Sequence, residues 1–265
     1  MAADPVPGPA RGRAYGHLQA VILRCSLAGG DSREKGCKIV KHLTLADEIV
    51  VLMLHDDTGA MRPACARVAS IAIAGGILME LALLGRIDTD LTSLFIVDPK
   101  PIGDDLLDQV LQEIAATLQR NSSSWWIERL GLHNGDLIGT VLGRLVEAGI
   151  LRTEDQQFLW VFSRRAYPQN SAGAEREAKA RLLSLIFDDA IPTPRDSLLF
   201  SLADSAGVLN DILSSSEMRK ASKRVAEIVA LEEIGRSVRA IVANRRMALA
   251  AAASGRSWVG PGRDW

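Results

Sequence analysis

The sequence predicts a mainly α-helical single domain, a helical bundle around one central buried helix at about residues 63–84, with one or two β-hairpins. The residues between Arg67 and Glu80 are all uncharged, and they are apolar except for one serine and two glycines. A helix that is apolar on every side belongs inside a protein or a bilayer, and this run is shorter than the roughly 20 apolar residues of a membrane span. Aromatic residues make up only 5% of the chain, while alanine and leucine abound, which favours helices over an all-β fold.

Charge and cysteine usage limit the classes of function. Lys and Arg total 31 and Asp and Glu total 32, a balance that argues against wholesale attraction to nucleic acid. The cysteines form no C-x-x-C pair and the four histidines are scattered, so we expect no disulfide framework, no metal site and no cofactor. The N-terminus lacks the apolar core of a signal peptide, which predicts a protein of the reducing cytoplasm.

Composition also suggests the domain boundaries. Residues 1–36 are rich in Pro, Gly, Ala and Arg, and we expect a flexible N-terminal extension there. Residues 37–254 are expected to form the helical domain. Residues 255–265 are rich in Gly and polar residues, which predicts a disordered tail.

The first two helices of the domain have recognisable start and stop signals. Thr44 and Asp47 have the spacing of a capping box before an apolar run, and Gly59 is expected to end that helix. The apolar run could also be a buried strand, but the cap and the length favour a helix. In the central helix that follows, Pro63 is suited to the first turn. Gly85 is expected to end the helix as a cap in the left-handed conformation.

The middle of the chain alternates between short strands and helices. The β-branched residues of 87–98 predict one or two short strands. Asp104 and Asp105 then begin a helix with apolar residues at helical spacing. Ser124 is expected to cap a short helix, and Asn134 another that ends near Gly149.

The last third of the chain contains a predicted hairpin and then helices. Residues 150–168 alternate enough to form a β-hairpin, with its turn expected near Glu154 and Asp155. From Ala174 onward the pattern is helical almost to the end. The four expected helices span residues 175–190, 195–213, 216–231 and 232–253.

The residues do not indicate an enzyme. There is no G-x-S-x-G elbow, and AGGDSREKGCK lacks the final Gly-Lys-[Ser/Thr] of a phosphate loop. Three pairs of adjacent aspartates lie at expected helix ends, where capping explains them better than acid–base chemistry. These pairs are Asp56-Asp57, Asp104-Asp105 and Asp188-Asp189.

Residues 124–162 have the element order of a winged helix, which makes a DNA-binding regulator one alternative. The helix that would enter the groove carries Asp136 and Glu147 against the single basic residue Arg144. Because a recognition helix needs several cations to contact phosphates, we consider nucleic acid an unexpected partner.

Basic residues gather in the C-terminal helices, and paired arginines follow aromatic residues at the end of the hairpin. An apolar and basic surface of this kind suits an anionic membrane, where apolar groups insert and cations meet head groups. A solvated helix face beside a packed hairpin explains the same residues equally well. The candidate lipid- or anion-binding residues are Arg67, Arg144, Trp160, Arg164 and Arg165.

Five blocks of sequence resemble a known family in their order and spacing. The blocks are LTLADEIVVLMLHDDTG, GGILMELALLGRI, VDPKPIGDDLLDQVL, LVEAGILRTEDQQFL and SRRAYP. Together they resemble the Golgi phosphoprotein three family, which includes bacterial GPP-type members, and the resemblance extends over roughly residues 38–253. It implies a helical bundle with a central buried helix and a protruding β-hairpin.

The resemblance also implies a non-enzymatic peripheral membrane protein that binds phosphatidylinositol 4-phosphate through a basic pocket. Eukaryotic members are adaptors that hold glycosyltransferase tails and use the hairpin for membrane contact or self-association. The family's pocket tryptophan corresponds to Cys65 here, and its three arginines to Ala74, Gly135 and Ile138. Losing these arginines should remove most of the phosphoinositide affinity, and it favours a bacterial member.

The sequence therefore predicts a peripheral adaptor on the inner face of a membrane. It would contact anionic lipid through the β-hairpin and a basic face, bind a protein partner, and form a homo-oligomer if the hairpin mediates self-association. A protein–protein interaction module without lipid binding is the first alternative, and the winged-helix regulator is the second.

Overall fold

The apolar run predicted as one central helix folds as two helices, α3 (Pro63–Ala66) and α4 (Ala69–Leu83). Between them the chain makes a turn, in which the Val68 amide donates to the Cys65 carbonyl oxygen at 2.9 Å. The prediction of an uninterrupted helix over 63–84 is therefore wrong at this point. Gly85 adopts a left-handed conformation (φ 65°) after α4, as predicted. Nearly all of α4 is buried, which confirms its central place in the bundle.

The computed structural model describes most of the chain between residues 43 and 253. The described ranges are 43–55, 58–90, 92–133, 135–158, 162–166, 173–188, 191–229 and 233–253. The predicted N-terminal extension and C-terminal tail lie outside these residues. Among the helices within them, none combines the length and the hydropathy that crossing a membrane requires.

Helix α2 (Leu45–Met53) begins with the predicted capping box. The Asp47 amide donates to Thr44 Oγ1 at 3.2 Å, and the Thr44 amide donates to Asp47 Oδ2 at 3.0 Å. Residues Leu45–Met53 are helical, so the strand alternative is wrong, and all nine of them are buried. The helix ends at Met53 rather than at Gly59, because Leu54 pairs with Met61 in a β-bridge.

Two strands and three helices follow α4. Strands β1 (Ile87–Thr89) and β2 (Leu94–Ile96) form an antiparallel pair, as predicted. Helix α5 (Asp105–Ala116) is capped by the carboxylate of Asp104. The cap predicted for the next helix, Ser124, is wrong, because Ser122 accepts a hydrogen bond at the start of α6 (Ser123–His133). Asp136 caps α7 (Leu137–Glu147), and Asn134, the predicted cap, lies outside the described residues. A run of candidate cap residues stands before each helix, so composition could not select the right one.

The predicted β-hairpin is present, but its turn lies elsewhere. Strand β3 (Glu154–Phe158) pairs antiparallel with β4 (Phe162–Ala166), and Phe158 lies opposite Phe162. Glu154 and Asp155, where the turn was expected, are the first two residues of β3. Residues 159–161, which connect the two strands, lie outside the described residues.

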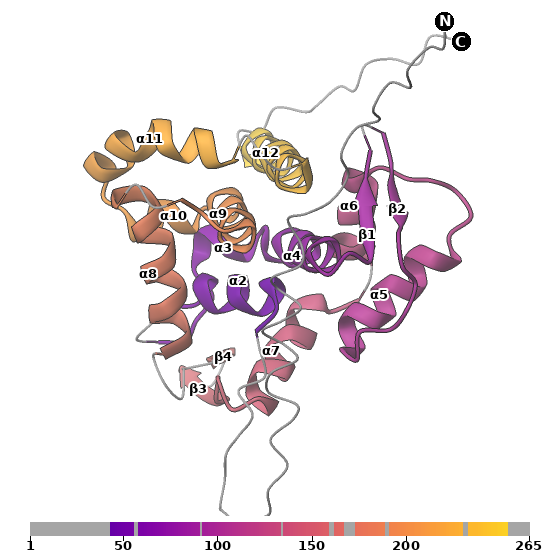
Figure 1. The fold of residues 1–265 in the computed structure, drawn as a ribbon. Helices are drawn as coiled ribbons and strands as arrows, with labels where there is room; N and C mark the ends of the chain where they lie inside the picture. Colours follow the sequence, from indigo (N-terminus) through magenta and orange to yellow (C-terminus); the bar gives the residue numbers. More distant parts are fainter. Residues whose placement is uncertain are drawn as a thin grey trace, which may run out of the picture. The chain divides into compact units, whose positions relative to one another are not determined.

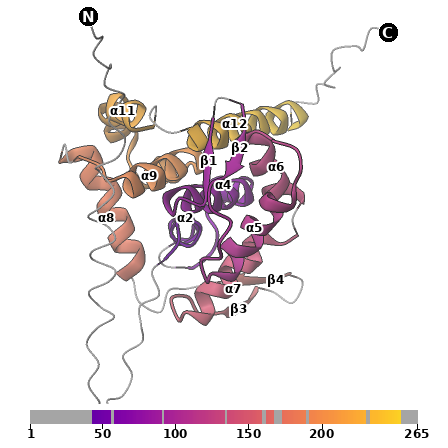
Figure 2. The same cartoon turned by 45° about the vertical axis from the view of Figure 1, so that its right-hand side comes forward.

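Five helices complete the bundle. They are α8 (Gly173–Phe187), α9 (Pro194–Ala206), α10 (Val208–Ile212), α11 (Ser215–Val229) and α12 (Glu233–Ala253). The single helix predicted over 195–213 is divided into α9 and α10 by Gly207, whose φ of 85° ends a right-handed helix. Helices α2, α6, α9 and α12 all pack on α4, and Figures 1 and 2 show α4 enclosed by them.

Candidate functional site

Arg144, one of the predicted anion-binding residues, lies on α7 with its charge already matched. Its two terminal nitrogens donate to the two carboxylate oxygens of Asp104 at 2.6 and 2.7 Å, and Nη2 also lies 3.3 Å from Asp47 Oδ2. Burial lowers the pKa of Arg144, but the bonds to Asp104 and Asp47 outweigh it and raise the pKa overall. Arg144 therefore ties α7 to the first turns of α2 and α5.

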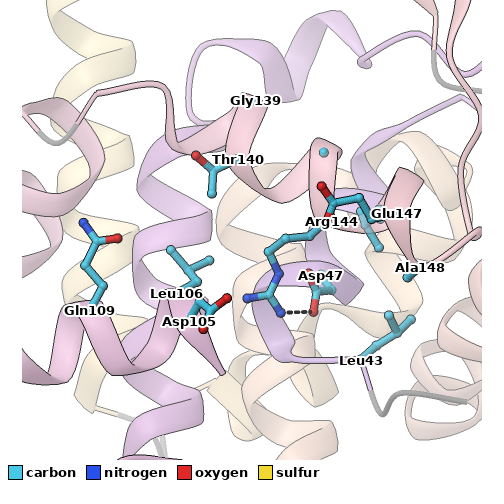
Figure 3. A pocket seen from close by; sticks show the side chains of 12 residues that line it. Leu43, Asp47, Asp105, Leu106, Gln109, Gly139, Thr140, Arg144, Glu147 and Ala148 are labelled. Atoms are coloured by element: carbon cyan, nitrogen blue, oxygen red, sulfur yellow. Dashed lines mark hydrogen bonds and ion pairs between the residues drawn. The ribbon is translucent and has the colours of Figure 1, made fainter. Parts of the chain in front are cut away.

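Arg144 stands at one wall of a cavity of about 610 Å³. We call this cavity the acidic groove, because three carboxylates line it beside this single guanidinium. Figure 3 shows the side chain of Arg144 pointing toward Asp47, with residues of α5 facing residues of α7. The lining residues are Leu43, Asp47, Asp105, Leu106, Gln109, Gly139, Thr140, Gly143, Arg144, Leu145, Glu147 and Ala148.

Arg67, another predicted residue, lines a different cavity of about 360 Å³, which we call the arginine pocket. Arg67 is exposed in the turn between α3 and α4, and Arg246 reaches the same pocket from α12. Within the described part of the chain, neither guanidinium forms an ion pair with a carboxylate; Arg246 Nη2 donates to the Ala206 carbonyl oxygen at 3.3 Å. The pocket is lined by Pro63, Ala64, Arg67, Val68, Gly207, Asn210, Arg246 and Ala250.

The remaining predicted residues belong to the hairpin. Trp160 lies outside the described residues. Arg164 and Arg165 are in β4, where their backbones pair with Gln156 and Asp155, but their side chains are not described. Of the five predicted residues, the structure thus places Arg67 and Arg144 in two separate cavities of opposite charge.

Sequence reasoning missed the residues that complete each cavity. Arg246 and Asn210 join Arg67 from helices far along the chain, and Asp105 and Glu147 join Arg144. Arg246 was recognisable only as one cation among many in the C-terminal helices. No spacing in the sequence relates it to Arg67, because tertiary packing alone brings α3 and α12 together.

Among the adjacent aspartates that the structure describes, Asp104 caps a helix, while Asp105 is the first residue of α5 and Asp188 follows the last residue of α8. Asp104 accepts hydrogen bonds from the amides of Leu106 and Leu107 at 3.1 and 3.2 Å and pairs with Arg144. In the described ranges, no group of three or more His, Cys, Asp or Glu side chains is arranged to hold a metal ion. Charged and apolar side chains line both cavities.

Comparison with known families accounts for this architecture. The sequence profile of a family described as Golgi phosphoprotein 3 (GPP34) matches residues 45–245. This chain belongs to the Golgi phosphoprotein 3 family. The match begins at the first residue of α2 and ends within α12, so it includes α4, the hairpin and most of the residues that line the two cavities. Leu43 of the acidic groove and Arg246 and Ala250 of the arginine pocket lie outside it.

One relative in the Golgi phosphoprotein 3 family comes from a fungus. The chain is 25% identical over 217 residues to vacuolar protein sorting-associated protein 74 of Eremothecium gossypii. The similar region covers 67% of this chain and 63% of the relative, so this chain matches less than two thirds of the relative's length.

The four positions that the sequence resemblance relates to a lipid pocket carry no cationic side chain. Cys65 and Ala74 are buried, Ile138 is half-buried, and Gly135 is exposed in a left-handed turn with φ 68°. Burial raises the pKa of the Cys65 thiol to about 11. The uncompensated arginine nearest to them in sequence is Arg67, two residues after Cys65.

Proposed function

We propose that this protein is a non-enzymatic adaptor that binds peripherally to anionic membranes through its β-hairpin and a basic face. Membership of the Golgi phosphoprotein 3 family supports the adaptor role. The hairpin, a two-stranded element that pairs only with itself in the described residues, supports a protruding contact. In this proposal the protein lies in the cytoplasm, on the inner face of a membrane.

The arginine pocket is the observation that carries the proposal. Arg67 and Arg246 stand beside apolar side chains, and neither of them forms an ion pair with a carboxylate of the described residues. A guanidinium without a counter-ion attracts the phosphate of a lipid head group, and each cation near an anionic surface adds about 1 kcal/mol to binding. Arg144 would have to leave Asp104 to meet a phosphate, so it contributes less in this proposal.

Lipid selectivity should be low. A phosphoinositide phosphate needs several charge-assisted donors at fixed places, and the four corresponding positions supply none from their side chains. We therefore expect recognition of negative charge in general rather than of phosphatidylinositol 4-phosphate in particular. A bacterial origin, which would fit this generic chemistry, stays a prediction.

Vesicle flotation tests the proposal. We expect the protein to float with vesicles that contain phosphatidylserine or phosphatidylglycerol, and to bind phosphoinositide vesicles only as well as their total charge predicts. It should not float with phosphatidylcholine vesicles. Equal absence from all three vesicle fractions would contradict the membrane role and favour an interaction module without lipid binding.

A variant of the β-hairpin tests whether the hairpin contacts the membrane in addition to the basic face. Replacing Arg164 and Arg165 by Glu should abolish flotation if β4 meets the membrane, because the charge that attracts the lipid is reversed. Replacing the same residues by Gln provides the control for local structure and should weaken flotation less. Unchanged flotation of the Glu variant would show that the hairpin only packs against protein.

A further inference from the structure

Two adjacent carboxylates in the first turn of α2 hold the helices on either side of the β-hairpin. Asp47 Oδ2 accepts from Arg144 Nη2 of α7 at 3.3 Å, and Glu48 Oε1 accepts from Arg181 Nη2 of α8. Helix α7 ends seven positions before the first residue of β3, and α8 begins seven positions after the last residue of β4. The chain is therefore tied to neighbouring residues of α2 both before and after the hairpin.

Both contacts are partly shielded from water. The two carboxylate residues are only 4% and 8% exposed, and the two arginines are half-buried. Arg144 also pairs with Asp104 at 2.6 Å, and Arg181 Nη1 lies 3.4 Å from Asp196 of α9. Because partly buried ion pairs are screened by salt much less than exposed ones, these contacts hold the two helices at physiological ionic strength.

The hairpin depends on α7 and α8 for its position. Strands β3 and β4 pair only with each other in the described residues, and no helix that the structure describes packs extensively on either strand. Both flanking helices also bury leucines in the bundle, but apolar packing has no preferred direction. A guanidinium that donates to a carboxylate adds that direction, so the ion pairs define how each helix is oriented.

We propose that Asp47 and Glu48 form an ionic clamp that fixes the orientation of the β-hairpin relative to the bundle. The clamp consists of the contacts Asp47–Arg144 and Glu48–Arg181. A hairpin that is held in one orientation loses less conformational freedom when it meets a binding surface, so the clamp lowers the entropic cost of that contact. The inference adds a positioning role to the proposed function, but the clamp is a property of the protein alone and requires no lipid.

The clamp can be opened while both buried carboxylates keep other hydrogen-bond donors. After replacement of Arg181, Glu48 still accepts from Arg195 Nη2 at 3.0 Å. After replacement of Arg144, Asp47 still accepts two hydrogen bonds within its own capping box. We therefore expect Arg144→Gln combined with Arg181→Gln, the double glutamine variant, to retain the helical bundle, which circular dichroism checks.

Distance measurements between two spin labels test the clamp. One label replaces Ser163 in β4 and the other replaces Ala240, an exposed residue of α12, in a background whose native cysteines are changed to alanine. With the clamp intact we expect one narrow distance distribution, and in the double glutamine variant a distribution roughly twice as wide. Each single glutamine variant opens one side and should give an intermediate width. A narrow distribution at the same distance in all variants, or a wide one with the clamp intact, would overturn the proposal.

Two control variants separate the clamp from a general loss of charge. Arg144→Lys combined with Arg181→Lys keeps both charges and one donor group at each position, so its distribution should be narrower than that of the double glutamine variant. Arg129→Gln removes a surface pair in which Arg129 Nε lies 2.6 Å from Glu113, and it should leave the distribution unchanged. Equal widths for the lysine and glutamine variants, or equal broadening by Arg129→Gln, would contradict an ionic clamp at α2.

Vesicle flotation distinguishes a failure of the clamp from a failure of the membrane role. Flotation of the wild type with anionic vesicles, together with equal distance distributions in all variants, would refute the clamp and leave the membrane role standing. Broadening in the double glutamine variant, together with no flotation of the wild type, would do the reverse.

Discussion

Arg195→Leu should lower the free energy of unfolding by about 3–5 kcal/mol, because it leaves the buried carboxylate of Glu80 without its cation. Arg195 Nη1 donates to both oxygens of Glu80 at 2.9 and 3.0 Å, and Nη2 donates to Glu48 at 3.0 Å. Glu80 is only 6% exposed in the middle of the apolar bundle. Arg195 thus joins α9 to α2 and α4, and chemical denaturation followed by circular dichroism measures its loss.

Two controls distinguish charge from packing in this experiment. Arg176→Leu removes an exposed arginine from α8, and its effect should stay within about 0.5 kcal/mol. Arg195→Leu combined with Glu80→Gln should recover part of the loss, since the neutral amide can still accept the hydrogen bond that Leu45 donates to Glu80 at 2.7 Å. A double variant less stable than Arg195→Leu would contradict the account of an uncompensated buried charge.

Gly76→Leu should lower the free energy of unfolding by about 3 kcal/mol, because α2 and α4 touch at this glycine. A Cβ built at Gly76 would lie 3.0 Å from the Ala46 amide nitrogen and 3.1 Å from its Cα. Both atoms belong to the backbone of α2, so a larger side chain must push the two helices apart. Thermal or chemical unfolding measures the effect directly.

Gly143→Ala is the matched control for Gly76, since both glycines lie inside helices. Gly143 faces open space, so alanine should stabilise α7 by up to about 1 kcal/mol. If Gly76→Leu were as stable as the wild type, this result would contradict the close packing of α2 against α4 at Gly76.

The sequence determined the fold class because its strongest signals are local or purely compositional. The uncharged run before Glu80 required a buried helix, and the spacing of Thr44 and Asp47 was enough to predict a cap. The errors fall where several residues could serve the same role. Ser122 and Ser124 could both start α6, and only the packing of Trp126, which is 1% exposed, sets the register.

The two cavities were not predictable in the same way, because packing assembles them from distant segments. Nothing in the sequence indicated that Arg144 is paired. In the structure its guanidinium forms an ion pair with the carboxylate of Asp104, which lies 40 positions earlier in the chain. Arg67, predicted as an anion-binding residue, is exposed in the structure, and nothing near it in the sequence indicated that Arg246 would share its pocket. Charge along a sequence shows which residues are ionic but does not show which of them the fold will pair.

Charge reversal in the arginine pocket tests the central claim most directly. Arg67→Glu combined with Arg246→Glu should reduce flotation with phosphatidylserine or phosphatidylglycerol vesicles at least tenfold, because two cations at the surface become anions. Lys100→Glu combined with Arg176→Glu, which changes the net charge of the protein equally at exposed positions outside the basic C-terminal helices, should reduce it much less. Equal flotation of the two double variants, both with circular dichroism like the wild type, would contradict a membrane contact at Arg67 and Arg246.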